Sequence, residues 1–208
     1  MTTEASQSAR DAWLKKESKS GGKLFFKTAV DVFARKGYHE TTVDEVAQAA
    51  GVAKGTIYYH FENKEELYLT VIQKGIDLFK EQLRQAMAAG ATTRDQIANI
   101  INCQIDFFEQ EQDVVSLFLT ELFGNDPQRS LLASRMLAEC LQIIRFCIEQ
   151  GITDGTLRQV DPETTTSSLF GMVVISALHY TRYHLPIPRG QAGVGAGIAE
   201  IFFQGTGA

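Results

Sequence analysis

ETTVDEVAQAAGVAKGTIYYHFENK, residues 40–64, is the stretch of sequence that decides the fold. Thr42 is followed three residues later by Glu45, a spacing typical of the capping box that starts a helix. Gly51 tolerates the positive φ with which a chain leaves a helix, so this helix is short. A second helix can begin almost at once, near Lys54. Two short helices joined by a three- or four-residue turn that contains glycine form a helix-turn-helix.

The second helix, from Lys54 to about Phe61, has an unusual surface for so short a segment. Ile57 and Phe61 lie four residues apart, so they face inward together. The rest of the circumference carries a lysine, a threonine and three rings with polar edges, namely Lys54, Thr56, Tyr58, Tyr59 and His60. These side chains suit phosphate oxygens and base edges, which indicates a DNA-binding surface.

The longer run FARKGYHETTVDEVAQAAGVAKGTIYYHFENKEEL, residues 33–67, resembles the DNA-binding domain of the tetracycline-repressor (TetR) family of bacterial transcription regulators. Nearly every signature position of that domain is filled. One position departs from the pattern, because Ala53 stands where the family usually has Ser or Thr at the start of the recognition helix. Loss of such a cap costs about 0.5–2 kcal/mol. A DNA phosphate can supply the missing acceptor, so we expect this helix start to be looser without DNA.

The resemblance implies a transcription regulator, with repression as the favoured direction because an occupied operator blocks polymerase. Single units of this size bind DNA weakly, and two-fold operators need two of them roughly 34–36 Å apart or more. We therefore expect a homodimer on a palindromic operator of double-stranded DNA. Phosphate contacts are expected from Thr42, Tyr59, His60 and, by family resemblance, Lys64. Contacts to base edges are expected from Lys54, Gly55, Thr56 and Tyr58.

Charge is divided unevenly along the 208 residues, whose formal net charge is −5. Residues 1–64 hold ten Lys or Arg and eight Asp or Glu, whereas residues 65–208 hold ten and seventeen. The basic excess therefore accompanies the helix-turn-helix, where phosphates are expected. The longest nearly uncharged apolar run, Leu169 to Leu178, is too short to span a bilayer. Without a secretory signal or CxxC spacing, the chain is expected in the cytoplasm, with no membrane partner.

The fold is predicted to be all α, with about nine helices, because no stretch alternates with period two. We divide it into a flexible tail over residues 1–22, a three-helix DNA-binding domain over 23–66, and an effector-binding and dimerisation domain over 67–208. An alternative for the tail is a basic arm that follows the DNA with Arg10, Lys15, Lys16 and Lys19. The helices are expected at residues 23–36, 42–50, 54–61, 64–88, 92–110, 113–123, 127–150, 162–184 and 194–204.

The second domain has more apolar residues than one buried face per helix requires. The resemblance implies that some of them line a cavity for a small effector, which we expect to be hydrophobic or aromatic because no basic cluster marks this half. For any single one of these apolar residues, ordinary core is the commoner role. An acyl-CoA stays possible, with Lys74, Lys80, Arg84 and Arg129 at the rim. The expected effector-binding residues are Phe79, Leu83, Ile101, Gln104, Ile105, Phe108, Phe118, Leu122, Met136, Cys140, Ile144, Phe170, Val174 and His179.

By the same resemblance the last two helices supply the dimer interface. The candidate residues are Leu169, Met172, Ile175, Leu178, Ile198, Ile201 and Phe202. Helical periodicity does not separate those that face the partner from those that face the protomer's own core.

Two other function classes fit the sequence less well. An enzyme has little support, because the sequence holds no GxSxG, P-loop or dinucleotide fingerprint, and no cofactor or metal is expected. His179 and His184 are five residues apart, unlike the pair of a helical zinc site. A redox sensor is the second alternative, since Cys103, Cys140 and Cys147 could respond to oxidants. All three lie on apolar helix faces, where inert thiols are commoner.

Overall fold

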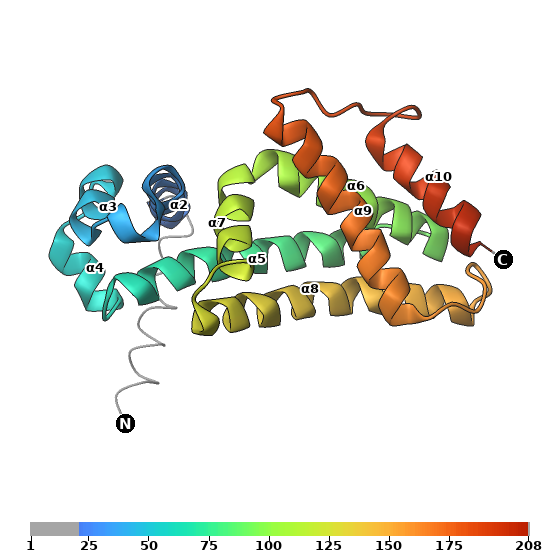
Figure 1. The fold of residues 1–208 in the computed structure, drawn as a ribbon, viewed down its shortest axis with the longest axis horizontal. Coiled ribbons are helices and arrows are strands. Elements are labelled where there is room, and N and C mark those ends of the chain that lie inside the picture. The colour runs from blue at the N-terminus through green and yellow to red at the C-terminus, as the bar shows by residue number, and fades with distance from the viewer. Residues whose placement is uncertain (1–20, 208) are drawn as a thin grey trace.

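The computed structural model describes residues 21–207, and the proposed tail and its basic arm fall almost wholly outside them. Within this range the chain forms nine helices and no strand, which confirms the all-α prediction (Figure 1). The helices are α2 (Gly21–Glu40), α3 (Val43–Ala50), α4 (Lys54–His60), α5 (Lys64–Ala88), α6 (Thr93–Gln110), α7 (Gln112–Leu122), α8 (Pro127–Thr153), α9 (Pro162–Arg182) and α10 (Val194–Thr206).

The first three helices form the helix-turn-helix unit for local reasons. Gly37 has φ 78° and breaks the helical path within α2. Thr42 and Glu45 make both bonds of the expected capping box at the start of α3. Gly51 has φ 67° and its N–H bonds back to α3, so the helix ends there as predicted. Ala53 gives α4 no side-chain cap, which confirms the departure from the family pattern.

The long helix α5 connects this unit to the rest of the molecule. It leaves α4 at one end of the molecule and runs through the second domain, with α8 alongside it (Figure 1). Its buried side includes Leu67, Val71 and Ile76, and α6 and α8 pack on it. Any movement of its far end would therefore be carried to the DNA-binding helices.

Gly151 does not end α8, contrary to the sequence-based expectation. The helix continues to Thr153, and Gly151 lies inside it, fully buried. A Cβ built on Gly151 would lie 3.0 Å from Leu157 and 3.1 Å from Thr93. The glycine is needed for close packing of two segments, and not for a positive φ.

Helices α9 and α10 pack on α6 and on each other. Three of the residues expected at the dimer interface, Leu169, Ile198 and Phe202, are at most 6% exposed and belong to the protomer's own core. Ile175 and Ile201 are 68% and 62% exposed. Met172 and Leu178 are half-buried. None of the helices between residues 21 and 207 has the apolar length that a membrane span needs.

Candidate DNA-binding surface and effector cavity

The outer face of α4 is open to solvent and carries the expected aromatic side chains. Tyr58 is 48% exposed and Tyr59 is 76% exposed, although both are large rings. Ile57 and Phe61 point inward and are 1% exposed, so the helix is anchored by its other face. Lys54 lies 2.8 Å from a carboxylate oxygen of Asp44. The helix therefore presents rings and a lysine at a protein surface, as a base-reading helix requires.

Gly55 and Thr56 occupy the first turn of this face. Gly55 is exposed, its φ is not positive, and a Cβ added to it would meet no atom within 4 Å. Neither backbone conformation nor internal packing requires a glycine here. Glycine also serves where a backbone must come close to a ligand, and DNA is the ligand that this surface suits. Thr42, at the start of α3, is exposed, and its side chain is already engaged as a helix cap.

Replacing Gly55 with alanine tests whether this residue allows close approach of the α4 backbone to DNA. We expect the melting temperature to stay level or rise, because alanine favours a helix by about 0.5–1 kcal/mol over glycine. Operator affinity should fall about tenfold, because the methyl group would lie between α4 and the DNA. Gly171→Ala, in α9, is the matched control for the stability gain, since its added Cβ also meets nothing within 4 Å in the protomer. Wild-type affinity of the Gly55 variant for operator DNA would contradict the proposed contact.

His60 does not fit the expected phosphate contact. Its side chain is 8% exposed, so it is buried inside the DNA-binding unit. The ring packs edge-on against Tyr59, with 4.9 Å between ring centres. His60 faces the interior because it lies three residues after the buried Ile57, one helical turn along α4.

Lys64 is also placed differently from the expectation. Its ammonium group donates to three carbonyl oxygens, those of Tyr38 at 2.8 Å, His39 at 3.1 Å and Thr41 at 2.9 Å. The same group lies over the Tyr38 ring, 4.5 Å from its centre. A lysine has three N–H donors, and all three are used within the protein. Lys64 ties the end of α2 to the start of α5 and has no donor left for a phosphate.

Paired variants separate the two lysines of this region. Lys64→Met should lower the free energy of unfolding by about 2 kcal/mol, because carbonyl groups lose charged donors. The slope of operator affinity against salt should not change. Lys54→Met should leave stability nearly intact, because its ion pair is exposed, and should reduce the salt slope by about one. Affinity measured over a range of salt concentrations, with denaturant unfolding of each variant, provides both readouts. A flattened slope for the Lys64 variant would restore it as a phosphate contact.

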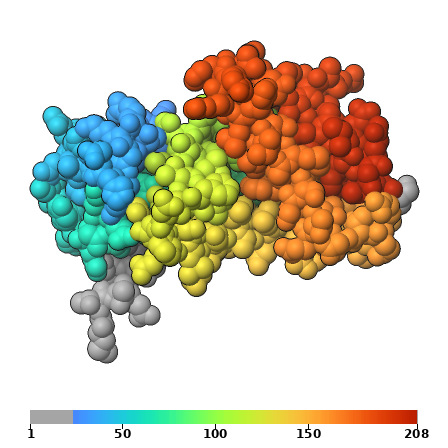
Figure 2. All heavy atoms as spheres, viewed as in Figure 1, coloured from blue at the N-terminus to red at the C-terminus, as the bar shows by residue number. Residues whose placement is uncertain are grey.

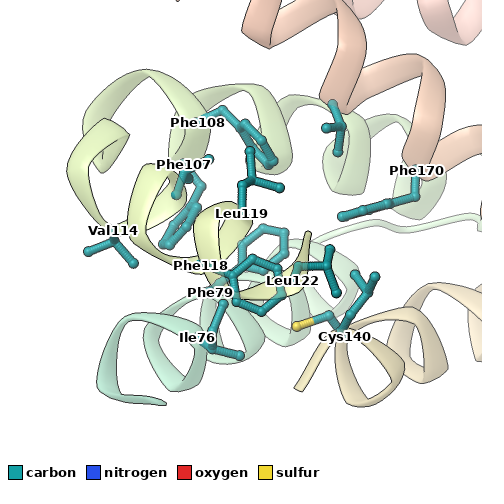
Figure 3. Close-up of a pocket in the computed structure, with 13 residues that line it drawn as sticks. Ile76, Phe79, Phe107, Phe108, Val114, Phe118, Leu119, Leu122, Cys140 and Phe170 are labelled. Carbon is teal, nitrogen blue, oxygen red and sulfur yellow. The ribbon is translucent and has the colours of Figure 1, made fainter. Parts of the chain in front are cut away.

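A small apolar cavity of about 40 Å³ lies in the second domain (Figure 3). Its wall consists of hydrocarbon side chains and one thiol from α5, α6, α7, α8 and α9. Seven of the expected effector-binding residues line it: Phe79, Phe108, Phe118, Leu122, Cys140, Phe170 and Val174. Sequence reasoning missed six further residues, Ile76, Phe107, Val114, Val115, Leu119 and Leu137. Phe107 and Phe108 both reach the cavity, although neighbours in a helix usually point apart.

The other expected effector-binding residues lie elsewhere. His179 is exposed and lines an open groove on the surface. The remaining six are at most 3% exposed and pack in the core without lining the cavity: Leu83, Ile101, Gln104, Ile105, Met136 and Ile144. Periodicity identified them as inward-facing, and it does not distinguish a cavity wall from filled core.

The cations expected at the cavity rim are mostly engaged. Lys80 lies 2.9 Å from Asp77 and 2.6 Å from Glu139, with 12% of its side chain exposed. Arg84 lies 3.9 Å from Glu81 on the same helix, and Arg129 is buried. None of the four, Lys74 included, lines the cavity.

A buried polar cluster joins the cavity region to the DNA-binding unit. The Tyr68 hydroxyl of α5 donates to Glu121 of α7 at 2.7 Å. Arg129 of α8 lies 3.5 Å from the other oxygen of that carboxylate and 3.0 Å from Asp126. Glu121 and Arg129 are 7% and 9% exposed. Burial and the bond to Glu121 raise the pKa of Tyr68, so its hydroxyl stays protonated and remains a donor.

Tyr38 closes this cluster from the side of α2. The Arg129 guanidinium lies over its ring, 4.4 Å from the ring centre, and the Tyr68 ring lies 4.9 Å away. Helix α7, which carries Glu121, also packs directly on α2 and supplies Phe118 and Leu122 to the cavity wall (Figure 1). One short helix therefore contacts both the cavity and the DNA-binding unit.

The surroundings of the three cysteines disfavour the thiolate form. Burial raises the pKa of Cys140 to about 12 and the pKa of Cys147 to about 11. The pKa of Cys103 rises to about 11, through burial and then the charge of Asp106. The thiolate is the reactive form, and it is scarce at neutral pH when the pKa is this high. These values do not favour a cysteine-based sensor.

Two sequence profiles of known families match this chain. Residues 25–71 match the profile of bacterial regulatory proteins of the TetR family, and residues 90–181 match the tetracyclin repressor-like C-terminal domain. The fatty acid metabolism regulator protein of Bacillus subtilis is 26% identical over 146 residues, which is 70% of this chain and 75% of that protein. The transcriptional activator FasR of Mycolicibacterium smegmatis is 27% identical over 164 residues, 79% of this chain and 74% of FasR.

Among solved structures, the regulator FadR from Bacillus subtilis in complex with stearoyl-CoA has the same fold, with a TM-score of 0.73 and 21% identity. The similarity covers 88% of this chain and 95% of that one. The profiles, the relatives and the helical architecture agree with the helix-turn-helix surface described above. This chain belongs to the TetR family of transcriptional regulators.

Proposed function

We propose that this regulator binds a palindromic operator as a homodimer and is released from it by a long-chain acyl effector, such as an acyl-CoA, in the cavity between α5 and α9. The observation that carries the proposal is the cavity wall, which holds no charged side chain and consists almost entirely of hydrocarbon. Such a wall suits an alkyl chain and offers nothing to a sugar or an amino acid. The names of the relatives that act in fatty acid metabolism support the same class of effector.

The DNA-binding part of the proposal rests on α4. Its open face, with Lys54, Thr56, Tyr58 and Tyr59, would read base edges and hold phosphates, with Gly55 allowing close approach. His60 and Lys64 are left out because both are used inside the protein. Dimerisation would bring a second α4 to the other half-site. The exposed apolar side chains of Ile175 and Ile201 support an interface along α9 and α10.

Transmission between the two sites would run through α7. A volume of about 40 Å³ holds about three water molecules and no alkyl chain, so an effector must enlarge the cavity. On one side the cavity wall consists of α7 alone, which is a short helix. Outward movement of α7 would disturb the bonds of Glu121 to Tyr68 and Arg129, and with them the seat of α2. An effector that favours this altered state weakens operator binding by the same coupling free energy.

Titration of an operator complex tests the function directly. A footprint on DNA flanking the protein's own gene would define the operator, and fluorescence anisotropy would follow its release. We expect release by palmitoyl-CoA at low concentration, and none by coenzyme A alone or by glucose. Release by a sugar or amino acid, with no response to any acyl compound, would overturn the effector assignment. The relative FasR is an activator, so family membership does not give the direction of regulation. Reporter transcription in cells decides between repression and activation.

A further inference from the structure

A surface groove beside the cavity has no role in the proposed function. It is open, has a volume of about 800 Å³, and lies between α7 and the second half of α9. The surface is hollowed in this region, between the yellow-green of α7 and the orange of α9 (Figure 2). A volume of this size is typical of small-molecule sites. Unlike the cavity, the groove has polar and charged side chains in its wall, among them Gln112, Thr120 and His179.

The groove and the cavity share three residues. Phe108, Val115 and Leu119 line both spaces, so these side chains lie between the apolar cavity and the open groove. Figure 3 shows Phe108 and Leu119 at one edge of the cavity. The cavity wall is thin here because the same side chains line the cavity and the groove. Side chains change rotamer far more readily than helices move, so this part of the wall opens most easily. An apolar tail can pass here while its head stays in water.

One cation in the groove, Arg182, suits an anionic head. Arg182 is the only lysine or arginine among the residues that line it, and within residues 21–207 its guanidinium has no ion-pair partner. Asp113 also lines the groove and forms no ion pair with Arg182. Guanidinium groups bind carboxylate and phosphate oxygens in bidentate fashion. Ile175 lines the groove as well, so in the proposed dimer the head would lie near the partner subunit.

We infer that cavity and groove form one bipartite site for a single-chain anionic amphiphile, whose tail enters the cavity past Phe108, Val115 and Leu119 while its head lies in the groove against Arg182. This inference rests on the proposed acyl effector and adds the access route and the site of the head. The shared chemistry is an anionic group on a long alkyl chain. Either the carboxylate of a free fatty acid or the phosphates of a coenzyme A ester can supply it.

Direct binding by calorimetry tests the inference with palmitoyl-CoA, palmitate and hexadecanol as probes. Arg182→Gln should weaken binding of palmitoyl-CoA or palmitate about tenfold and leave hexadecanol unchanged. Arg84→Gln is the matched control, because Arg84 is exposed on α5 and does not line the groove. Whichever anionic probe loses affinity identifies the source of the head. Equal affinities of the Arg182 and Arg84 variants for both anionic probes would overturn the assignment.

Leu119→Trp tests the access route separately. The larger side chain should narrow the passage and slow association of all three probes at least tenfold in stopped-flow measurements. The melting temperature shows whether the variant is folded, and Arg182→Gln keeps the test open if it is not. If no probe binds the wild-type protein, the proposed effector class itself fails. If the probes bind but both variants behave as wild type, only the bipartite site fails.

Discussion

Replacing Glu121 with alanine is expected to lower the free energy of unfolding by about 3 kcal/mol. The carboxylate is buried and is shared by the Tyr68 hydroxyl and the Arg129 guanidinium. Its loss leaves a buried hydroxyl and a buried cation short of a partner, and breaking a buried ion pair in this way costs about 3–5 kcal/mol. Arg129 keeps Asp126 at 3.0 Å, which places the effect near the lower end. Urea unfolding at fixed protein concentration measures it, since the proposed dimerisation would contribute to stability.

Glu149→Ala is the matched control for this experiment. Glu149 pairs with Arg145 at 2.8 Å on α8, but both side chains are 46% exposed. Exposed pairs contribute about 0–1 kcal/mol, so the control should unfold almost as the wild type does. Equal losses for the two variants would mean that the cluster around Glu121 is no more than a surface pair. The Glu121 variant should also lose part of the response to effector, because its contact with α5 and α8 is gone.

The sequence predicted the helices well where the signals are local. The capping box at Thr42 and the left-handed Gly51 depend on residues within one turn, and both are present. The start of α5 at Lys64 and its end at Ala88 were also predicted. Gly151 carries the same local signal as Gly51, yet its role is set by Leu157 and Thr93, which contact it through the fold. A glycine in sequence does not reveal which of these roles it has.

Less of the candidate site could be predicted from the sequence, because its contacts join distant parts of the chain. Lys64 bonds carbonyl groups that lie 23 to 26 residues earlier, and the family pattern alone suggested a phosphate contact. Glu121 and Tyr68 are 53 residues apart, and no sequence signal connected them. The cavity wall and the filled core have the same apolar composition and helical spacing. Only packing decides that Phe118 lines the cavity and Ile101 does not.

Gly75→Ala is expected to weaken operator binding about tenfold in the absence of any effector. Gly75 is buried in α5 where α7 crosses it, and an added Cβ would lie 2.2 Å from Cγ1 and 3.3 Å from Cβ of Val114. Valine is restricted at χ1, and its second methyl group would lie only 3.2 Å away, so rotation does not relieve the clash. Helix α7 must therefore move away from α5, as the proposed effector would move it.

The stability of the Gly75→Ala variant distinguishes displacement of α7 from the gain in helix propensity that alanine brings to α5. Alanine at a helix position with free space stabilises by about 0.5–1 kcal/mol relative to glycine. Gly171→Ala, in α9, has that space within the protomer and should show this gain. At Gly75 the overpacking, which costs about 1–3 kcal/mol, outweighs the gain, so the melting temperature should fall.

A second substitution shows whether α7 is responsible. Val114→Ala removes both methyl groups that the new Cβ would meet, so the double variant should recover stability and operator affinity together. Recovery of stability without recovery of affinity would mean that the position of α7 does not set the DNA-binding state. Recovery of both would mean that one methyl group at position 75, which lies outside the cavity wall and the operator-binding surface, controls DNA binding through α7.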